Sequence, residues 1–390
     1  MIEGRNIICF GPSDWWGMNP SCATHIMSRF TAKNKVLYIN PFSSDFSGGT
    51  KSGMSRRIAR KIKSIVKCLK RPAKRLYVFS PVFIPLQGRP IIDAINNVFL
   101  KLQIKLVCLF LGFSKPVLWM ENVRAADALD WFDNKIVIYH VSDLFEECNY
   151  VSNKNMSRVR EQKISESSDV LICVSRRLYE TKAGQRENVF YLPHGVDFEL
   201  FRQAANNDNE VAEELAGIPK PIAGYYGTLT ASNDVELLRY CATRLPDVSF
   251  VLAGEITGGD YVKLLKLRNV YHLGKIPYKR IPFICAGFDV CLLQWKVDKW
   301  IRFCNPLKFF EYMASGRPIV SVPIDEVAMY SDVVSIAQNE KEFCDAIVLE
   351  LHNDATWRAA KRIDIAREHS WDSHIERLSE IITGAIDAKR

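Results

Sequence analysis

The stretch Asn305-Pro-Leu-Lys-Phe-Phe-Glu-Tyr-Met-Ala-Ser-Gly-Arg-Pro-Ile-Val320 carries the signals of a helix followed at once by a strand. Pro306 suits the first turn of a helix, where its missing N–H costs no hydrogen bond. Gly316 and Pro318 form a stop signal, and an apolar strand begins at Ile319. Three apolar residues of the helix recur at a spacing that faces a core: Phe309, Phe310 and Met313. The stretch therefore predicts one helix–strand step of an α/β domain.

The beginning of this helix has the chemistry of an anion site. Asn305, Pro306 and Leu307 place backbone N–H groups at a helix N-terminus, which attracts negative charge. Lys308 adds a cation in the first turn, where the helix dipole alone favours an acid, so a phosphate is the expected partner. Glu311 lies one turn on from Leu307, and its carboxylate can accept hydrogen bonds from a ribose diol. An ordinary amphipathic helix with a capped end is the alternative.

The same alternation of strands and helices runs along the whole chain in two successive sets. Six apolar runs precede a polar stretch at 203–210, and six follow it. The expected strands are 6–10, 35–40, 116–120, 135–141, 169–175 and 189–193, then 222–227, 249–254, 270–274, 289–295, 318–322 and 333–337. Continuous β-branched runs between helices indicate parallel strands buried on both faces. The pattern predicts two doubly wound α/β domains, with ligand at the carboxyl ends of the strands.

Length and composition agree with two globular domains. The chain has 390 residues, of which 48% are hydrophobic and 25% charged. It contains no run of about 18 uncharged apolar residues, and its N-terminus lacks the features of a signal peptide. Its eleven cysteines are scattered and form no Cys-x-x-Cys pair. We therefore expect reduced, buried cysteines, no metal site and a cytoplasmic protein.

The helix–strand segment at 305–320 resembles the nucleotide-binding segment of GT-B glycosyltransferases, the superfamily built of two Rossmann-like domains facing a central cleft. Three further stretches resemble the same superfamily in the same order: 189–201, 224–238 and 269–293. The resemblance implies an N-terminal acceptor-binding domain at 1–195, with a basic insertion at about 51–113. It implies a nucleotide-sugar-binding domain at 196–365 and a last helix, 366–390, that crosses back. Its donor residues correspond here to Gly227, Thr228, Lys275, Ile276, Asn305, Pro306, Leu307, Lys308 and Glu311, with a UDP-sugar as the expected donor and no other cofactor.

Departures from the pattern bear on the mechanism. Retaining members carry a glutamate at the position of Phe303, and Arg and Lys at the positions of Thr228 and Asn233. Asp143, in IVIYHVSDLFEE, follows a predicted strand by two residues and resembles the general base of the inverting, membrane-associated glucuronosyltransferase of xanthan biosynthesis. An inverting transfer needs such a base and positive groups on the leaving diphosphate, and the chain has no Asp-x-Asp pair. Asp143 is also a candidate N-cap, with Glu146 completing a capping box.

The loop after the first strand, 11–27, is the expected acceptor side. Asp14 and His25 have counterparts in the same glucuronosyltransferase, while Trp15 and Trp16 offer rings for stacking on a sugar or contacting lipid headgroups. Each of these four residues has an equally simple interpretation as packing.

A basic segment follows this loop. Eleven Lys and Arg and no acid lie between Lys51 and Arg75. Apolar residues at helical spacing in 55–75 predict a basic amphipathic helix on an anionic membrane, and the stretch 91–113 is a second amphipathic candidate. The basic residues expected at the membrane are Arg56, Arg57, Arg60, Lys61, Lys63 and Lys67. A solvated face and nucleic-acid binding are the alternatives, but no base-stacking module accompanies the segment.

Together these features predict a glycosyltransferase at the inner face of a membrane. It would move a sugar from a nucleotide sugar to a lipid-linked or membrane-displayed saccharide, inverting and independent of metal. The rivals are a retaining transferase of the same fold and a non-catalytic GT-B subunit that binds a nucleotide sugar or a glycan.

Overall fold

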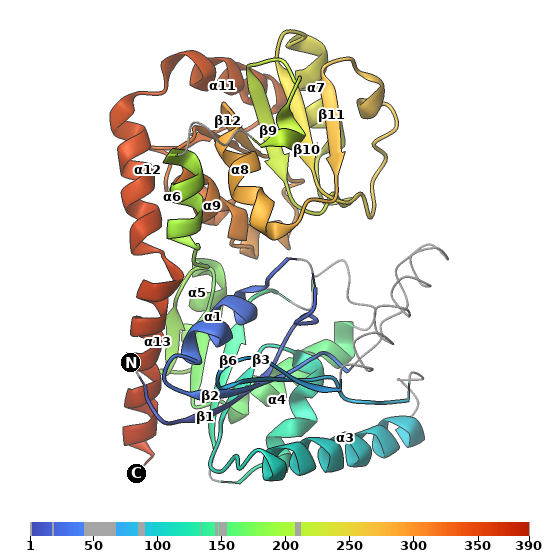
Figure 1. Ribbon diagram of the computed structural model, residues 1–390, viewed down its shortest axis with the longest axis vertical. Helices are drawn as coiled ribbons and strands as arrows, with labels where there is room; N and C mark the ends of the chain where they lie inside the picture. The colour runs from blue at the N-terminus through green and yellow to red at the C-terminus, as the bar shows by residue number, and fades with distance from the viewer. Residues whose placement is uncertain are drawn as a thin grey trace. The chain divides into compact units, whose positions relative to one another are not determined.

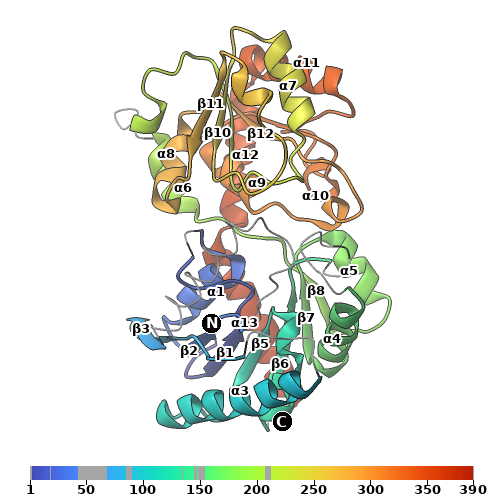
Figure 2. The same ribbon diagram turned by 90° about the vertical axis from the view of Figure 1, so that its right-hand side faces the viewer.

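The computed structural model describes residues 2–17, 19–42, 68–84, 90–133, 135–144, 147, 154–206 and 212–389. The chain forms two units, one of Met1–Leu192 with His374–Arg390 and the other of Pro193–Ser373 (Figures 1 and 2). Both units contain a largely parallel sheet with helices packed around it, as the α/β prediction requires. No helix among the described residues is long and apolar enough to cross a membrane.

In the first unit, the described strands form a sheet in the order β3-β4-β2-β1-β5-β6-β7-β8. Their bounds are β1 Asn6–Phe10, β2 Lys35–Ile39, β3 Leu69–Ala73, β4 Leu76–Phe79, β5 Val117–Met120, β6 Ile136–Val141, β7 Val170–Cys173 and β8 Val189–Tyr191. All neighbours are parallel except β3 and β4, and Ile7 of β1 pairs with Val36 on one side and Val117 on the other. These central strands are buried on both faces, which explains their continuous apolar sequence.

The described helices of the first unit are α1 Cys22–Phe30, α3 Pro90–Phe110, α4 Lys154–Ser167, α5 Arg176–Ala183 and α13 Trp371–Ala388, with the 3₁₀ helix η1 Val123–Trp131. Ser21 and Thr24 form a reciprocal capping box at the start of α1. Most of α13 belongs to this unit, where Lys389 just beyond it pairs with Asp169 at 2.7 Å.

The strand β3 corrects the last part, 69–75, of the helix predicted over 55–75, whose residues 55–67 lie outside the described residues. Leu69–Ala73 pairs antiparallel with β4, and Arg75 closes the turn between them with a φ of 64°. Pro72 explains the outcome, because proline removes a helical hydrogen bond but is tolerated in an edge strand. Arg56, Arg57, Arg60, Lys61, Lys63 and Lys67 lie outside the described residues.

In the second unit, the described strands form a parallel sheet in the order β11-β10-β9-β12-β13-β14. They are β9 Ile222–Tyr226, β10 Ser249–Ala253, β11 Val270–Gly274, β12 Val290–Leu293, β13 Ile319–Ser321 and β14 Ser335–Ile336. The helices are α6 Phe198–Asn206, α7 Val235–Arg244, α8 Ile281–Ala286, α9 Leu307–Ser315, α10 Asp325–Ala328, α11 Glu340–Asn353 and α12 Thr356–Glu368. Short 3₁₀ helices are η2 Glu213–Leu215, η3 Leu264–Lys266, η4 Tyr278–Arg280 and η5 Ile301–Phe303.

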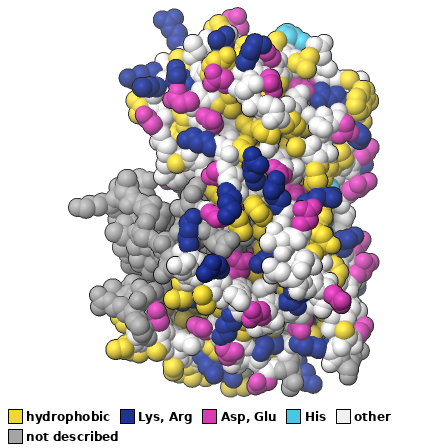
Figure 3. Space-filling view, turned by 180° about the vertical axis from the view of Figure 1, so that it is seen from behind, with side chains coloured by type: hydrophobic (Ala, Val, Ile, Leu, Met, Phe, Trp, Pro, Cys, Tyr) yellow, Lys and Arg dark blue, Asp and Glu magenta, His cyan; other side chains and the backbone are white. Residues whose placement is uncertain are grey.

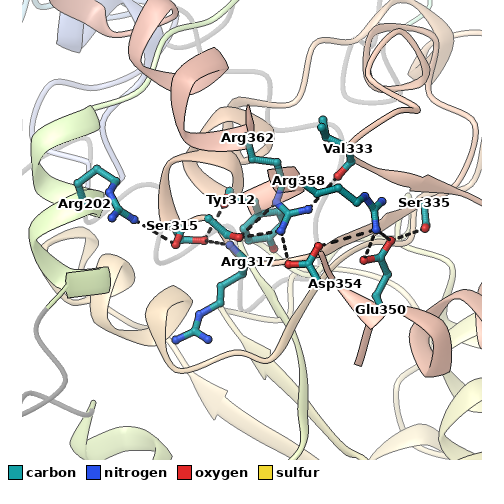
Figure 4. A network of polar contacts seen from close by, with 11 residues as sticks. Arg202, Tyr312, Ser315, Arg317, Val333, Ser335, Glu350, Asp354, Arg358 and Arg362 are labelled. Atoms are coloured by element: carbon teal, nitrogen blue, oxygen red, sulfur yellow. Dashed lines mark hydrogen bonds and ion pairs between the residues drawn. The ribbon is translucent and has the colours of Figure 1, made fainter. Parts of the chain in front are cut away.

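A buried polar network fixes the C-terminal end of α9 (Figure 4). Gly316 ends the helix in the left-handed conformation, with a φ of 78°. The guanidinium of Arg362, on α12, is fully buried and donates to the Gly316 carbonyl at 2.8 Å and to the Val333 carbonyl at 3.1 Å. Asp354 accepts from the same guanidinium at 2.5 Å and balances its charge. The helix that carries the predicted phosphate site is therefore held firmly at its far end.

Candidate donor and acceptor sites

The predicted phosphate site lies at the start of α9, beside the carboxyl end of β9. Pro306 is the N-cap residue of α9 and makes no side-chain cap hydrogen bond. The first turn therefore keeps N–H groups that have no acceptor within the helix. Lys308 lies in this first turn and is half-buried. Its ammonium has no ion-pair partner in the part of the chain that the structure describes.

Two aromatic rings hold the ammonium of Lys308. Its Nζ lies 5.0 Å from the ring centroid of Tyr225 and 4.7 Å from that of Trp295. The indole N–H of Trp295 donates to the hydroxyl of Tyr225 at 3.3 Å, which fixes the two rings to each other. Ring faces attract cations, so the amine is positioned before any ligand arrives.

Gly227 leaves room for this amine. A methyl group on Gly227 would lie 3.3 Å from the Nζ of Lys308, and the residue has a φ of +131°, which side-chain-bearing residues rarely adopt. Its own N–H already donates to the carbonyl of Ala253 at 2.9 Å. Gly227 therefore contributes space at the site and not a phosphate donor.

Glu311 is buried one turn further along α9. Its carboxylate accepts hydrogen bonds from the hydroxyls of Tyr226 and Tyr278, the latter at 3.0 Å. Burial raises the pKa of Glu311 to about 7, although the two tyrosine hydroxyls and the nearby Lys308 oppose the rise. A ribose diol must therefore share this carboxylate with two tyrosines.

The remaining predicted donor residues are more peripheral. Asn305 is buried, and its amide donates to Glu326 at 3.4 Å, while Leu307 is half-buried. Thr228 and Lys275 are exposed, and Ile276 is buried. The Nζ of Lys275 lies 3.8 Å from a carboxylate oxygen of Glu255, with both side chains well exposed, and such pairs contribute little stability.

The structure shows what occupies the positions of the missing retaining residues. Asn233 is buried, and its side-chain oxygen accepts from the N–H of Thr230 at 2.8 Å, so it shapes the loop after β9. Phe303 ends η5 and is half-buried. Neither residue supplies the charge expected there in a retaining member.

Asp143 lies two residues beyond the end of β6, at the carboxyl edge of the first unit's sheet, and is half-buried. Glu146, its partner in the alternative capping-box interpretation, lies outside the described residues. The position agrees with where a base would be placed by a parallel sheet, whose strands present their following loops at one edge.

The predicted acceptor loop is ordered by its own contacts. Asp14 accepts from the N–H of Trp16 at 2.9 Å, and the ring of Trp15 packs edge-on against Tyr38 at 5.0 Å. Trp16 is half-buried. His25 lies inside α1, where burial and then Arg29 lower the pKa of its imidazole to about 3, so it is neutral at physiological pH.

A buried cluster of Cys22, Glu121 and His140 in the first unit was not predicted from the sequence. His140, on β6, has its Nδ1 3.3 Å from a carboxylate oxygen of Glu121, and the sulfur of Cys22 lies 3.9 Å from both of its ring nitrogens. Such Cys, Glu and His side chains are metal ligands in general. However, a sulfur equidistant from both nitrogens lies off either lone-pair direction. A zinc ion at its usual ~2.0 Å from one nitrogen, along that nitrogen's lone pair, would therefore lie farther from this sulfur than the ~2.3 Å zinc–sulfur bond.

The tyrosines and the tryptophan around Lys308 and Glu311 are also absent from the sequence predictions. Tyr225 and Tyr226 end β9 directly before Gly227, and Trp295 follows β12. Aromatic residues at the carboxyl ends of two strands are the signal that could have identified them, because such ends line ligand sites in α/β proteins.

Part of the chain is similar in sequence to known glycosyltransferases. Residues 235–380 match a family model described as glycosyl transferase-like. The chain is 27% identical over 257 residues to a protein of Bacillus subtilis (strain 168) named teichuronic acid biosynthesis glycosyltransferase TuaH. That alignment covers 60% of this chain and 64% of the relative, so it spans less than two thirds of the relative's length.

Solved structures share the fold at low sequence identity. Sucrose-phosphate synthase from Thermosynechococcus elongatus has a TM-score of 0.71 at 13% identity, covering 98% of this chain and all of its own. Anabaena HepE in complex with UDP-glucose has a TM-score of 0.67 at 15% identity, covering 97% of this chain and 99% of its own. The chain therefore has the GT-B fold, and residues 235–380 are similar in sequence to glycosyl transferase-like proteins.

Proposed function

We propose that the protein is a glycosyltransferase of polysaccharide assembly that moves a sugar from a UDP-sugar to a saccharide carried on a membrane lipid. The observation that carries the proposal is the pairing of Lys308 with Glu311 on the first turns of α9. One supplies a pre-positioned cation at a helix N-terminus and the other a buried carboxylate. Diphosphate and ribose are the two parts of a nucleotide sugar that need these groups. The UDP-glucose complex of HepE and the name of TuaH support the choice of donor and pathway class.

The second unit, which carries Lys308 and Glu311, would stabilise the leaving group. As the bond from the sugar's anomeric carbon to the diphosphate oxygen breaks, negative charge grows on that oxygen. The Lys308 ammonium and the N–H groups of the first turn of α9 would bear on this charge. Fixed charges and dipoles of this kind are usually the largest contribution to transition-state stabilisation.

The first unit, which carries Asp143, would supply the base. In an inverting transfer, the acceptor hydroxyl attacks the anomeric carbon from the face opposite the diphosphate, and its proton passes to a carboxylate. Asp143 is our candidate, since it follows β6 at the carboxyl edge of the sheet. The reaction then releases UDP and a glycoside of inverted configuration, and the residues named here require no metal ion.

The experiment that tests the proposal is UDP binding by calorimetry with Lys308→Ala. Loss of a charge-assisted hydrogen bond costs about 1.5–3 kcal/mol, so the Kd for UDP should rise about tenfold to a hundredfold. Lys266→Ala is the matched control, because Lys266 precedes β11 and so lies at the opposite edge of the sheet. Equal UDP affinity in the two variants would remove Lys308 from the donor site.

A further inference from the structure

The helix α3 has two apolar faces, and only one of them packs against the unit. Leu100, Ile104 and Cys108 recur every four residues and are buried. On the opposite side, six large apolar side chains recur every three or four residues and are between 49% and 78% exposed: Ile91, Ile95, Val98, Leu102, Leu106 and Leu109. We call these six residues the outer face of α3. Hydrophobic side chains are visible at the lower left of Figure 3, the side on which α3 lies in that view.

The segment 82–84 lies along the flank of α3 between its buried face and its outer face. Gln103 accepts from the N–H of Val82 at 3.0 Å and donates to its carbonyl at 2.8 Å. Asn96 does the same for Ile84, at 2.7 and 2.9 Å. The backbone is thereby satisfied while the side chains of Val82 and Ile84 stay 43% and 38% exposed. An arrangement that fixes apolar groups outward is typical of an interaction surface.

Positive charge borders the outer face. Lys101 and Lys105 are exposed on the adjoining side of the helix, and Asp93 is the one acidic residue between 90 and 110. Lysines in this position extend their charged ends to lipid headgroups while their stems stay against apolar surface.

A basic hollow adjoins the C-terminal end of α3. It is lined by Arg5, Lys33, Lys35, Arg71 and Arg75 together with Gly4, Asn6, Asn34 and Tyr77, with no acidic residue among them. Lys35 connects it to the helix, because its ammonium donates to the Leu111 carbonyl and lies 5.4 Å from the ring centroid of Phe113. Glu3 pairs with one of the cations, Lys33, at 3.5 Å, and both side chains are exposed.

We propose that the outer face of α3 and the basic hollow together dock the protein on an anionic lipid surface. Apolar side chains would enter the boundary between headgroups and acyl chains, and the hollow would face lipid phosphates, the combination that binds interfacial helices to membranes. A second copy of the chain fits less well, because a contact between two outer faces would also bring the lysine edges of both helices, at Lys101 and Lys105, to the interface. The proposal rests on the proposed function only in the choice of a membrane as partner.

Co-sedimentation with phosphatidylglycerol vesicles tests the proposal without donor or acceptor. The variant is Ile91→Asn, Leu102→Asn, Leu109→Asn, and the control replaces three exposed apolar residues elsewhere, Val159→Asn, Val262→Asn and Leu349→Asn. Binding is compared at about 0.5 M salt, where a screening length of about 4 Å suppresses charge attraction and isolates the apolar contribution. The α3 variant should partition at least about tenfold less than the control, since partitioning scales with buried apolar area.

Two further measurements keep the result decisive. Matched unfolding midpoints and UDP affinities show that the α3 variant is folded, and lost UDP binding alone would count against the proposed function and not against docking. At low salt, Lys33→Gln with Arg71→Gln should reduce the preference for phosphatidylglycerol over phosphatidylcholine. Wild-type partitioning by the α3 variant would overturn the proposal. So would sedimentation velocity that shows a wild-type dimer converted to monomer by the α3 changes.

Discussion

At the scale of single residues, the protonation of the Glu311 carboxylate should make the stability of the protein depend on pH. Its pKa is about 7 in the fold, against 4.5 in an unfolded chain. Between these values the folded state holds a proton that the unfolded state has lost, so stability should fall as pH rises from 4.5 to 7. The full effect is about 3 kcal/mol, at 1.36 kcal/mol per pKa unit. Denaturant unfolding from pH 4.5 to 8 measures it.

The variant Glu311→Gln isolates this contribution. Glutamine keeps the size and the acceptor oxygen but does not titrate, so its unfolding free energy should decline less over the same pH range. Because ribose hydroxyls donate best to an ionised carboxylate, UDP affinity of the unaltered protein should rise through pH 7, and that rise should vanish in Glu311→Gln. Parallel pH profiles for the two proteins would show that another group titrates.

Asp143 carries the inverting mechanism. Asp143→Asn retains the shape and most of the capping ability but cannot take a proton, so turnover should fall about 10²–10⁴-fold. UDP affinity should stay unchanged, and stability should drop by no more than about 1 kcal/mol, since asparagine caps helices as well as aspartate. Asp127→Asn, an exposed change in the same unit, is the control. Near-normal turnover by Asp143→Asn would revive a retaining mechanism.

Local rules identify some site residues and not others. Lys308 and Glu311 follow from the chemistry of one helix N-terminus, which is readable in seven consecutive residues. Trp295 meets Tyr225, the other ring beside Lys308, only because β12 lies beside β9 in the sheet. Likewise, Glu121 and His140 touch because β5 and β6 pair, a contact set by strand order and not by spacing.

At the scale of elements, α9 depends on the arginine that binds its last turn. Arg362→Met would leave the carboxylate of Asp354 and two carbonyls without their buried donor, and breaking a buried ion pair from one side costs about 3–5 kcal/mol. Thermal or urea unfolding should show this loss. Arg367→Met, on the same helix, removes an exposed pair with Asp364 and should cost less than about 1 kcal/mol. Similar losses in both variants would contradict the role given to the network.

Element prediction succeeded where burial on both faces imposes one pattern. The strands from β5 to β13 appear within two residues of their expected ends, because parallel strands need continuous apolar runs. It failed over 69–73, where the adjacent cations Lys70 and Arg71 suited the polar face of an amphipathic helix and an exposed edge strand equally well. The proline at position 72 favoured the strand.

At the scale of the whole molecule, the first unit is assembled from both ends of the chain. The residues from His374 to Arg390 belong with Met1–Leu192, and Lys389 donates to the Lys135 carbonyl at 3.0 Å and pairs with Asp169. The periodicity of the sequence predicts helices near the C-terminus but not the unit they join. The expectation that the last helix crosses back to the first domain came from the family resemblance. The sequence of a helix indicates which of its faces is apolar but not which surface covers that face.

The place of α3 in the first unit bears on how far an acceptor must extend. Asn6 and Lys35, which begin β1 and β2, bond to the carbonyls of Ser114 and Leu111 just after α3, so this end of the helix lies at the amino edge of the sheet. Asp143 lies beyond the other edge, and the six residues of β6 span about 20 Å at 3.3 Å each. A hydroxyl at headgroup depth would stop short of Asp143 if α3 rests on the bilayer. The height of the first unit would then select acceptors by length. Lipids that carry a single sugar would be too short to react, whereas lipids that already carry a short oligosaccharide would reach Asp143. Turnover measured with acceptors of graded length would reveal this selection.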